Sequence, residues 1–230
     1  MIAEEKIIIA LDTQDEKRFS SLLSALEGKK VWVKIGMECF YSLGPSAVHS
    51  AKEKGYKIFL DLKLHDIPNT VGKSLSALSA LPFDMINVHA AGGSEMMKKA
   101  AEVIHGIPSS PLLIAVTQLT STSQRMMNDE QRISGDILES VTHFAKLAKD
   151  CGLHGVVSSP LETQAIKLIC GSRFLTVTPG IRPKSSGSDD QVRITTPAEA
   201  LRLGTDYMVI GRPITEAPSP LAALEEILKG

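Results

Sequence analysis

The sequence predicts a single-domain (β/α)8 barrel, in which parallel strands alternate with covering helices. Eight short apolar runs rich in β-branched residues occur along the chain, and amphipathic segments separate them. The length of 230 residues is also close to the usual size of such a barrel. We expect one domain over residues 1–230, because no repeat or linker divides the chain. A doubly wound open sheet is the alternative, but no G-x-G-x-x-G follows the first apolar run.

The predicted strands and helices follow one another at regular intervals. Helical spacing of apolar residues, bounded by Gly or Pro, predicts helices such as 15–28, 44–55, 94–106 and 135–152. Two connections, 119–135 and 181–197, are long and polar, and long loops in compact domains often bind ligands. The predicted strands cover residues 6–12, 31–36, 57–63, 85–90, 112–118, 155–160, 174–180 and 207–212.

Composition and charge restrict the partners that we expect. The formal net charge of −1 provides no global basic field, so we expect neither nucleic acid nor a membrane as a partner. Cys39, Cys151 and Cys170 are widely spaced and include no C-x-x-C, so no disulfide framework or zinc site is predicted. The N-terminus does not resemble a signal peptide and no stretch is apolar enough to span a bilayer, so we expect a cytoplasmic protein.

The stretch FLDLKLHDIP, residues 59–68, places ions inside an apolar strand. Because side chains alternate along a strand, Asp61 and Lys63 share one face, which we expect to point into the barrel mouth while the leucines pack outward. Asp12 and Lys34 also stand at strand ends, and active sites of these barrels lie at that rim. A purely structural ion pair is the alternative, but such pairs contribute little net stability. A functional site is therefore favoured.

Lys63 is predicted to donate a proton and not to act as an amine nucleophile. Asp61 lies two residues before it and Asp66 three residues after it. Nearby carboxylates favour the charged ammonium, whereas a Schiff-base lysine must be neutral to react.

A phosphate-binding end is predicted after the seventh and eighth strands. Arg212 follows Gly211 at the end of the eighth strand, and Gly180 in TPGIR occupies the matching place after the seventh. Barrels of this class frequently bind phosphate there. His65 and His89 lack the spacing of metal ligands and are interpreted as structural. Further polar residues at predicted strand ends are Gln118, Ser158, Ser159 and Thr178.

Taken together, these motifs resemble the orotidine 5′-phosphate decarboxylase family. The D-x-K-x-x-D motif followed by IPNT is the most specific element. The resemblance implies a barrel that converts orotidine monophosphate to UMP in pyrimidine synthesis, without cofactor or metal, as a homodimer with shared active sites. It covers essentially the whole chain, through ALD, VKIGMECFYSLGP, FLDLKLHDIPNTV, INVHAAGG, VTQLTST, TPGIR, DQVR and DYMVIGRPIT.

The resemblance also implies roles for individual residues. Lys34, Asp61 and Lys63 would form a charged network, and Lys63 would deliver a proton to C6 of the pyrimidine. Asp66 of the partner subunit would join that network. The other implied contacts are Asp12 with the ribose, Thr120 near the pyrimidine, Gln191 between base and phosphate, Arg182, Gly211 and Arg212 at the phosphate, and Ile67 and Thr70 with the neighbouring site.

Two alternative functions stay open. Magnesium-dependent sugar-phosphate decarboxylases or aldolases on a similar barrel share D-x-K-x-x-D but carry a glutamate where this chain has Lys34. A cation at that position would repel magnesium, which prefers oxygen ligands. The second alternative is a non-catalytic barrel that binds a phosphate ligand, and the presence of both Lys63 and Asp66 argues against it.

Overall fold

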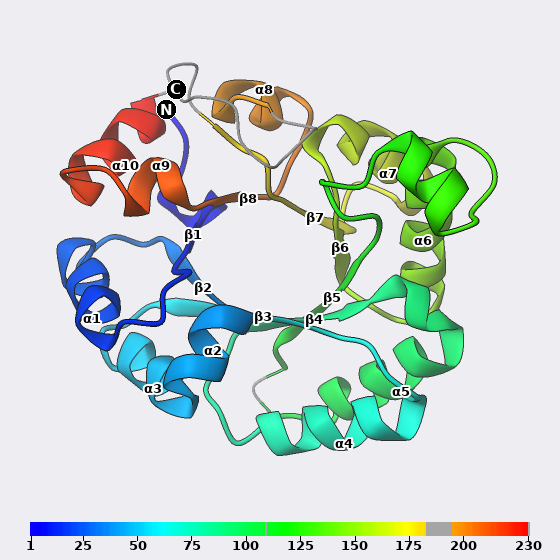
Figure 1. Ribbon diagram of the computed structural model, residues 1–230, viewed down its shortest axis with the longest axis horizontal. Coiled ribbons are helices and arrows are strands. Elements are labelled where there is room, and N and C mark those ends of the chain that lie inside the picture. The colour runs from blue at the N-terminus through cyan, green and yellow to red at the C-terminus, as the bar shows by residue number, and fades with distance from the viewer. Residues whose placement is uncertain (109, 183–194, 230) are drawn as a thin grey trace.

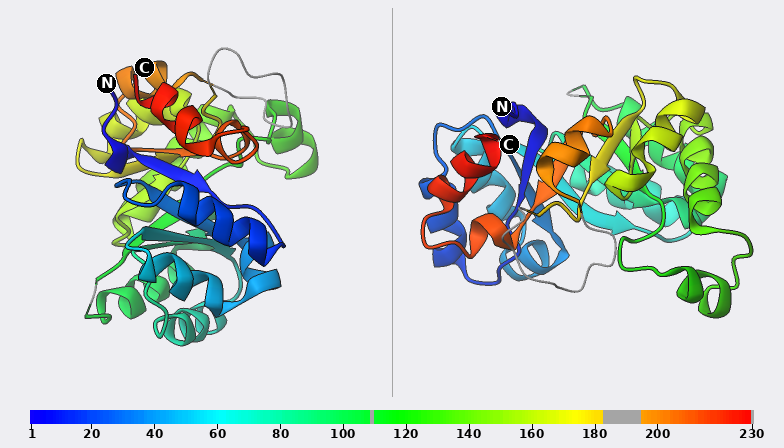
Figure 2. Two further views of the ribbon diagram at one scale, coloured as in Figure 1. Left: turned by 90° about the vertical axis from the view of Figure 1, so that its left-hand side faces the viewer. Right: turned by 90° about the horizontal axis from the view of Figure 1, so that it is seen from above.

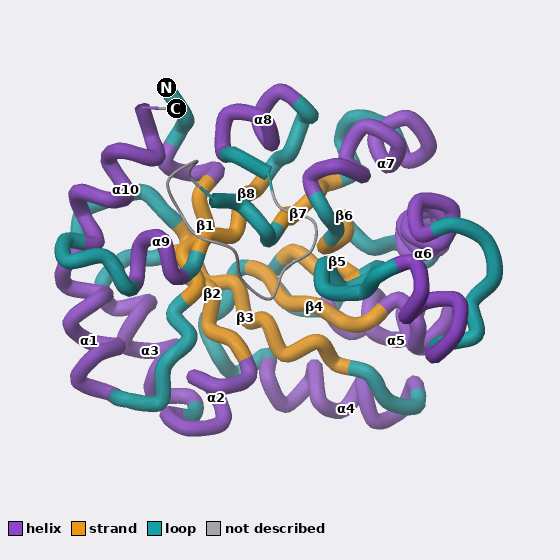
Figure 3. Tube along the Cα trace, turned by 45° about the horizontal axis from the view of Figure 1, so that its top comes forward, coloured by secondary structure: helices purple, strands orange, loops and turns teal. Residues whose placement is uncertain are grey.

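The computed structural model describes residues 1–108, 110–182 and 195–229. Its centre is a closed parallel barrel whose strands are neighbours in sequence order from β1 to β8, and helices surround it (Figures 1 and 3). The predicted (β/α)8 barrel is therefore confirmed. The strands are β1 (Ile7–Ala10), β2 (Trp32–Gly36), β3 (Lys57–Leu64), β4 (Met85–His89), β5 (Leu112–Val116), β6 (Gly155–Val157), β7 (Leu175–Thr178) and β8 (Tyr207–Ile210).

Several strands end earlier than predicted. Asp12, Gln118 and Arg212 each lie just beyond the hydrogen-bonded part of their strand. The chain leaves the ladder where it begins to turn towards its helix, so Asp12 and Gln118 stand on loops at the rim and Arg212 is the first residue of a helix. Loops held by a rigid barrel are where binding residues usually occur.

The four helices predicted from the sequence by their residue ranges are all present, and side-chain caps mark where two of them begin. Asp15 accepts the amide hydrogens of Lys17 and Arg18 at the start of α1, and Asp136 and Glu139 form a capping box on α6. Within the described residues, no helix is long and apolar enough to cross a bilayer. The helices are α1 (Glu16–Ala25), α2 (Met37–Leu43), α3 (Pro45–Glu53), α4 (Pro68–Leu78), α5 (Gly93–His105), α6 (Ile137–Asp150), α7 (Thr163–Cys170), α8 (Pro197–Arg202), α9 (Arg212–Thr215) and α10 (Pro220–Lys229).

Two apolar layers hold the barrel together. Leu60 and Leu62 of β3 belong to the larger layer, between strands and helices, which confirms that the leucines of this strand face outward. The smaller layer fills the inside of the barrel below the rim, and its large side chains close the barrel floor. It consists of Ile8, Ala10, Trp32, Phe59, Met85, Ile114, Val177 and Val209.

Of the two long connections predicted from the sequence, the first is described in full and the second only at its ends. The segment between β5 and α6 leaves the barrel (Figure 2) and contains a helical turn over Met126–Glu130. Gln124 braces it, since its side chain contacts Asn128, the carbonyl of Gly135 and the amide of Ile137. The second connection, with Gln191, lies mostly outside the described residues.

Side-chain acceptors tie two pairs of adjacent strands together at the end of the barrel opposite the rim. Asp84, just before β4, accepts the amide hydrogen of Ile58 on β3 at 2.8 Å. Asp206, just before β8, accepts that of Thr176 on β7 at 2.7 Å and the ammonium of Lys167 at 2.6 Å. A charged acceptor for a backbone amide makes a stronger hydrogen bond than a neutral one. These contacts stabilise the barrel without taking part in its rim.

Asp206→Ala should lower the free energy of unfolding by about 1.5–3 kcal/mol, because a buried amide loses a charged acceptor. The control is Asp150→Ala, which removes an exposed ion pair with Lys146 and should cost no more than about 0.5 kcal/mol. Urea denaturation measures both variants. Equal costs would contradict the role given to Asp206.

Candidate active site

A cavity of about 600 Å³ opens at the C-terminal rim of the barrel, which is within the size range of sites for small ligands. Its apolar lining includes Phe59, Val116, Val157 and Val209, whereas its rim is polar and charged. Eight of the residues predicted for the site line this one cavity: Asp12, Lys34, Asp61, Lys63, Thr120, Arg182, Gly211 and Arg212.

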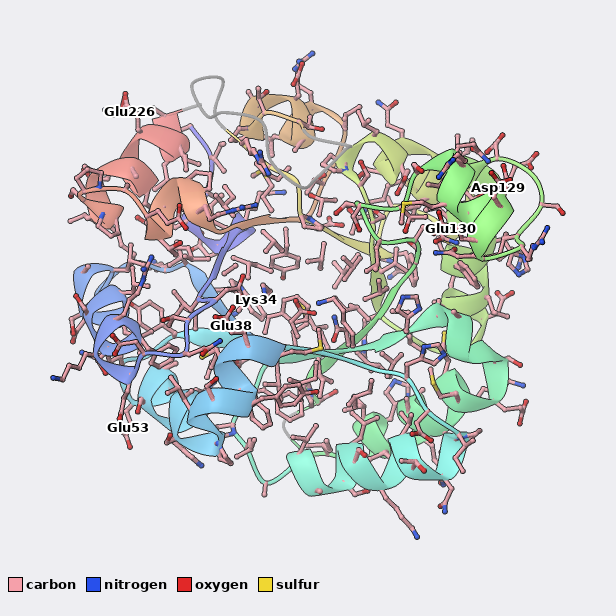
Figure 4. All side chains as sticks on the ribbon, viewed as in Figure 1. Lys34, Glu38, Glu53, Asp129, Glu130 and Glu226 are labelled. Atoms are coloured by element: carbon pink, nitrogen blue, oxygen red, sulfur yellow. The ribbon has the colours of Figure 1, made fainter. Side chains whose placement is uncertain are left out.

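Four ions form a continuous chain along one wall of the cavity. The ammonium of Lys34 lies 3.0 Å from an oxygen of Asp12 and 3.2 Å from Oδ2 of Asp61. The ammonium of Lys63 lies 2.7 Å from Oδ1 of Asp61. Lys34 points into the middle of the barrel, whereas Asp129 and Glu130 lie at its periphery (Figure 4). The sequence thus placed these four side chains correctly at one rim.

The chain of ions keeps its inner members charged despite their burial. Burial disfavours the charged form of Lys34, but Asp61 and Asp12 outweigh it and raise the pKa of Lys34 above its ordinary value. Burial likewise opposes ionisation of Asp61, yet Lys34 and Lys63, with hydrogen bonds from Lys63 and Asn87, lower the pKa of Asp61. The site therefore presents fixed positive and negative charges to anything bound in the cavity.

Lys63 lies in an irregular part of β3, which the regular alternation of side chains along a strand did not predict. The pairing of β3 with β4 shifts between Leu60 and Leu64, and Lys63 adopts a left-handed backbone with φ of 50°. That conformation costs a non-glycine residue about 1–2 kcal/mol. Lys63 still reaches Asp61, as predicted, but the contact depends on this bulge and not on regular alternation.

Two residues at the site were not identified from the sequence. Asn87 of β4 is fully buried and donates to Oδ1 of Asp61 at 2.7 Å. Its only signal was a polar residue in the middle of the apolar run MINVHA. Gly36 leaves room for the ions, since a Cβ there would lie 2.9 Å from Nζ of Lys34 and 3.0 Å from Oδ1 of Asp12.

The predicted phosphate end lies at the same cavity. Arg182 is held at its lining because its amide donates to the carbonyl of Thr195, and the amide of Thr195 donates to the carbonyl of Gly180, each at 3.0 Å. Gly211 and Arg212 join the lining at the start of α9. The cavity is therefore lined by the chain of ions and by two arginine residues.

Some predicted residues do not line the cavity. Asp66 is exposed and accepts the amide hydrogen of Ile67, and neither Ile67 nor Thr70 lines the cavity of this chain. Gln191 lies outside the described residues.

Strand-end polar residues outside the ionic chain have mostly local roles. His89 accepts from the amide of Ala91, and its ring stacks on that of His65, which agrees with their interpretation as structural. Ser159 caps a short turn. Gln118 lines the cavity and donates to Ser140. Across the described part of the chain, no group of three or more His, Cys, Asp and Glu side chains is arranged to hold a metal ion.

Comparisons with known proteins agree on one family. The family model of the orotidine 5′-phosphate decarboxylase / HUMPS family matches residues 5–227. Orotidine 5′-phosphate decarboxylases of Bacillus cereus (strain G9842) and Bacillus cytotoxicus are each 50% identical over 227 residues, covering 97% of this chain and 95% of theirs. The crystal structure of orotidine 5′-phosphate decarboxylase from Lactobacillus acidophilus is 44% identical, with a TM-score of 0.85 and 97% of each chain covered. This chain belongs to the orotidine 5′-phosphate decarboxylase / HUMPS family.

Proposed function

We propose that this protein decarboxylates orotidine 5′-monophosphate to UMP in pyrimidine biosynthesis. The proposal is carried by the alternating chain of Asp12, Lys34, Asp61 and Lys63 at the cavity. Relatives described as orotidine 5′-phosphate decarboxylases, at 50% identity over almost the whole chain, support the same reaction.

Lys63 would supply both charge stabilisation and the proton. Loss of CO2 from C6 leaves negative charge on a ring carbon with little resonance relief, so an ammonium aimed at that carbon lowers the energy of the transition state. The same ammonium then protonates C6, and the carbon–carbon electron pair released by CO2 becomes the new C–H bond. Asp61 holds the ammonium of Lys63 at 2.7 Å and so fixes its direction.

The distant phosphate would contribute to the rate as well as to binding. Arg182 and Arg212 line the same cavity as the proposed proton donor, with Gly211 between β8 and α9. Binding energy from a part of the substrate that does not react can be used to position the reacting part. Asp12 would contact the ribose, and Thr120 the pyrimidine, because both line the cavity.

Lys34 favours this reaction over the magnesium-dependent one. The family model also covers the HUMPS group, so membership alone does not choose between reactions. The ammonium of Lys34 lies within 3.2 Å of Asp61 and 3.0 Å of Asp12, where it neutralises the two carboxylates that a cation would need. A magnesium ion at this place would meet a fixed positive charge.

We further propose a homodimer in which Asp66, Ile67 and Thr70 complete the site of the neighbouring subunit. These residues precede or begin α4, at the mouth side of β3, and Ile67 is 66% exposed despite its apolar side chain. A cytoplasmic location is also proposed, because the three cysteines are buried free thiols, which suits a reducing compartment.

Lys63→Ala should lower kcat/KM for orotidine monophosphate by about 1,000-fold or more, since one group stabilises charge and delivers the proton. The fall in absorbance as orotate becomes uracil measures the rate, with a chelator present throughout. Lys146→Ala, which removes an exposed lysine of α6, is the control and should retain activity. Activity that requires added magnesium, or that survives the loss of Lys63, would contradict the mechanism.

Arg212→Ala should reduce kcat/KM for orotidine monophosphate about 10- to 100-fold, the effect of losing a hydrogen bond to a charged group. Orotidine, which lacks the phosphate, is the matched comparison. Its slower turnover should be almost unaffected by the same substitution. Equal losses with both substrates would show that Arg212 acts elsewhere than on the phosphate.

Mixing Asp66→Ala with Lys63→Ala subunits tests the shared site. If Asp66 serves the partner's cavity, a mixed dimer contains one complete site of two, and an equal mixture regains about a quarter of wild-type activity. Each variant alone is the control, after the same unfolding and refolding. No regain, although gel filtration and subunit exchange show mixed dimers, would place Asp66 in its own subunit's site, and wild-type activity of Asp66→Ala alone would place it in neither site.

A further inference from the structure

We propose that Asn87 is a positioning residue for the decarboxylation, which fixes Asp61 and Lys63 relative to one another. This inference rests on the proposed function. Asn87 does not line the cavity, and it would act only through the two ions that do.

The side chain of Asn87 contacts both ions through different atoms. Its amide nitrogen donates to Oδ1 of Asp61 at 2.7 Å, and its amide oxygen accepts the backbone N–H of Lys63 at 2.8 Å. Oδ1 of Asp61 is also the atom that receives the ammonium of Lys63, at 2.7 Å. Asn87, Asp61 and Lys63 therefore form a closed ring of hydrogen bonds.

The pairing of β3 with β4 explains why an amide side chain is needed there. Leu60 pairs with Ile86 and Leu64 with Val88, so residues 61–63 of β3 stand opposite Asn87 alone. The bulge removes the regular ladder partner of the Lys63 N–H, and the Asn87 side chain replaces it. Because a buried polar group without a partner is costly, Asn87 supports the left-handed backbone of Lys63.

The surroundings of Asn87 favour an uncharged side chain that can both donate and accept a hydrogen bond. The residue is fully buried, and Asp61 of its hydrogen-bonded ring also pairs with Lys34 of β2, which pairs in turn with Asp12 on the loop after β1. On its own strand, His89 stacks on His65 beyond Lys63. An uncharged group that donates at one atom and accepts at another satisfies both contacts without adding a charge.

Two variants separate the contacts. Asn87→Leu keeps the number of side-chain heavy atoms and the branch at Cγ, and it removes both hydrogen bonds. Asn87→Asp keeps the acceptor for the Lys63 amide but replaces the donor by an oxygen, at the place where the nitrogen lies 2.7 Å from Asp61. The control is Thr176→Val, which removes the hydroxyl of another fully buried strand residue, bonded to Asp206 at the opposite end of the barrel.

We expect Asn87→Leu to lower kcat on the order of 100-fold, the scale of a misplaced catalytic group, with KM changed less than about threefold. KM should be retained because the residues at the phosphate end keep their contacts. Thr176→Val, matched for burial and for the loss of a hydrogen bond, should keep kcat within about threefold of wild type.

Asn87→Asp gives a signature that a merely structural role would not produce. Two carboxylates in contact cannot both be ionised at low cost, so one of them takes up a proton in an accessible pH range. The protonated carboxyl resembles the amide, with one donor and one acceptor. The ratio of variant to wild-type kcat should therefore rise as the pH falls from 8 to 5.5, and using the ratio cancels the pH effects that both proteins share.

The outcomes distinguish this inference from the proposed function. Inactive wild-type protein would refute the function itself. Active wild type and inactive Lys63→Ala, with both Asn87 variants within threefold of Thr176→Val or with a pH-independent ratio for Asn87→Asp, would overturn only the role of Asn87. If Asn87→Leu does not fold, the pH dependence of Asn87→Asp decides. Failure of both to fold while Thr176→Val folds would make Asn87 a folding residue and would also overturn the proposal.

Discussion

The burial of one carboxylate, that of Asp61, is the constraint on which the rest of the site depends. An ionised group in an apolar barrel is tolerated only when it is paired and hydrogen-bonded. Asp61 receives the ammonium groups of Lys34 and Lys63 and the amide of Asn87, on three different strands. Removing any one of these donors would leave buried charge with less compensation, so the four groups behave as a unit.

The barrel register brings these donors to one level. Lys34 is opposite Ala10 on one side and Phe59 on the other, and Gly36 is opposite Asp61. Parallel strands in a closed barrel all present their C-terminal ends at the same rim, so groups far apart in sequence meet without long loops. The absence of a side chain at Gly36 then leaves space for the ammonium of Lys34.

Stability and chemistry are divided between the two ends of the barrel. At the end opposite the rim, Asp84 and Asp206 tie neighbouring strands through backbone amides, and apolar side chains fill the interior. The rim contains buried ions and Lys63, whose backbone is in the left-handed conformation. Strained and charged residues cluster at functional sites when the surrounding structure holds them in place. The wall that carries Lys63 is thus held in place by the contacts of the rest of the barrel.

The sequence by itself determined the barrel, the strand that carries the D-x-K-x-x-D motif and the convergence of Asp12, Lys34, Asp61 and Lys63, because strand periodicity and position depend on local pattern. It also indicated Arg212 of the cavity, whereas Arg182 was implied by the resemblance to the family. Only the tertiary structure decided the bulge at Lys63 and the contacts of Asn87, since these depend on how β3 pairs with β4. The alternation of side chains along one strand contains no information about a shift in pairing between two strands. The role of Asn87 could not be predicted because its partners, Asp61 and Lys63, belong to another strand.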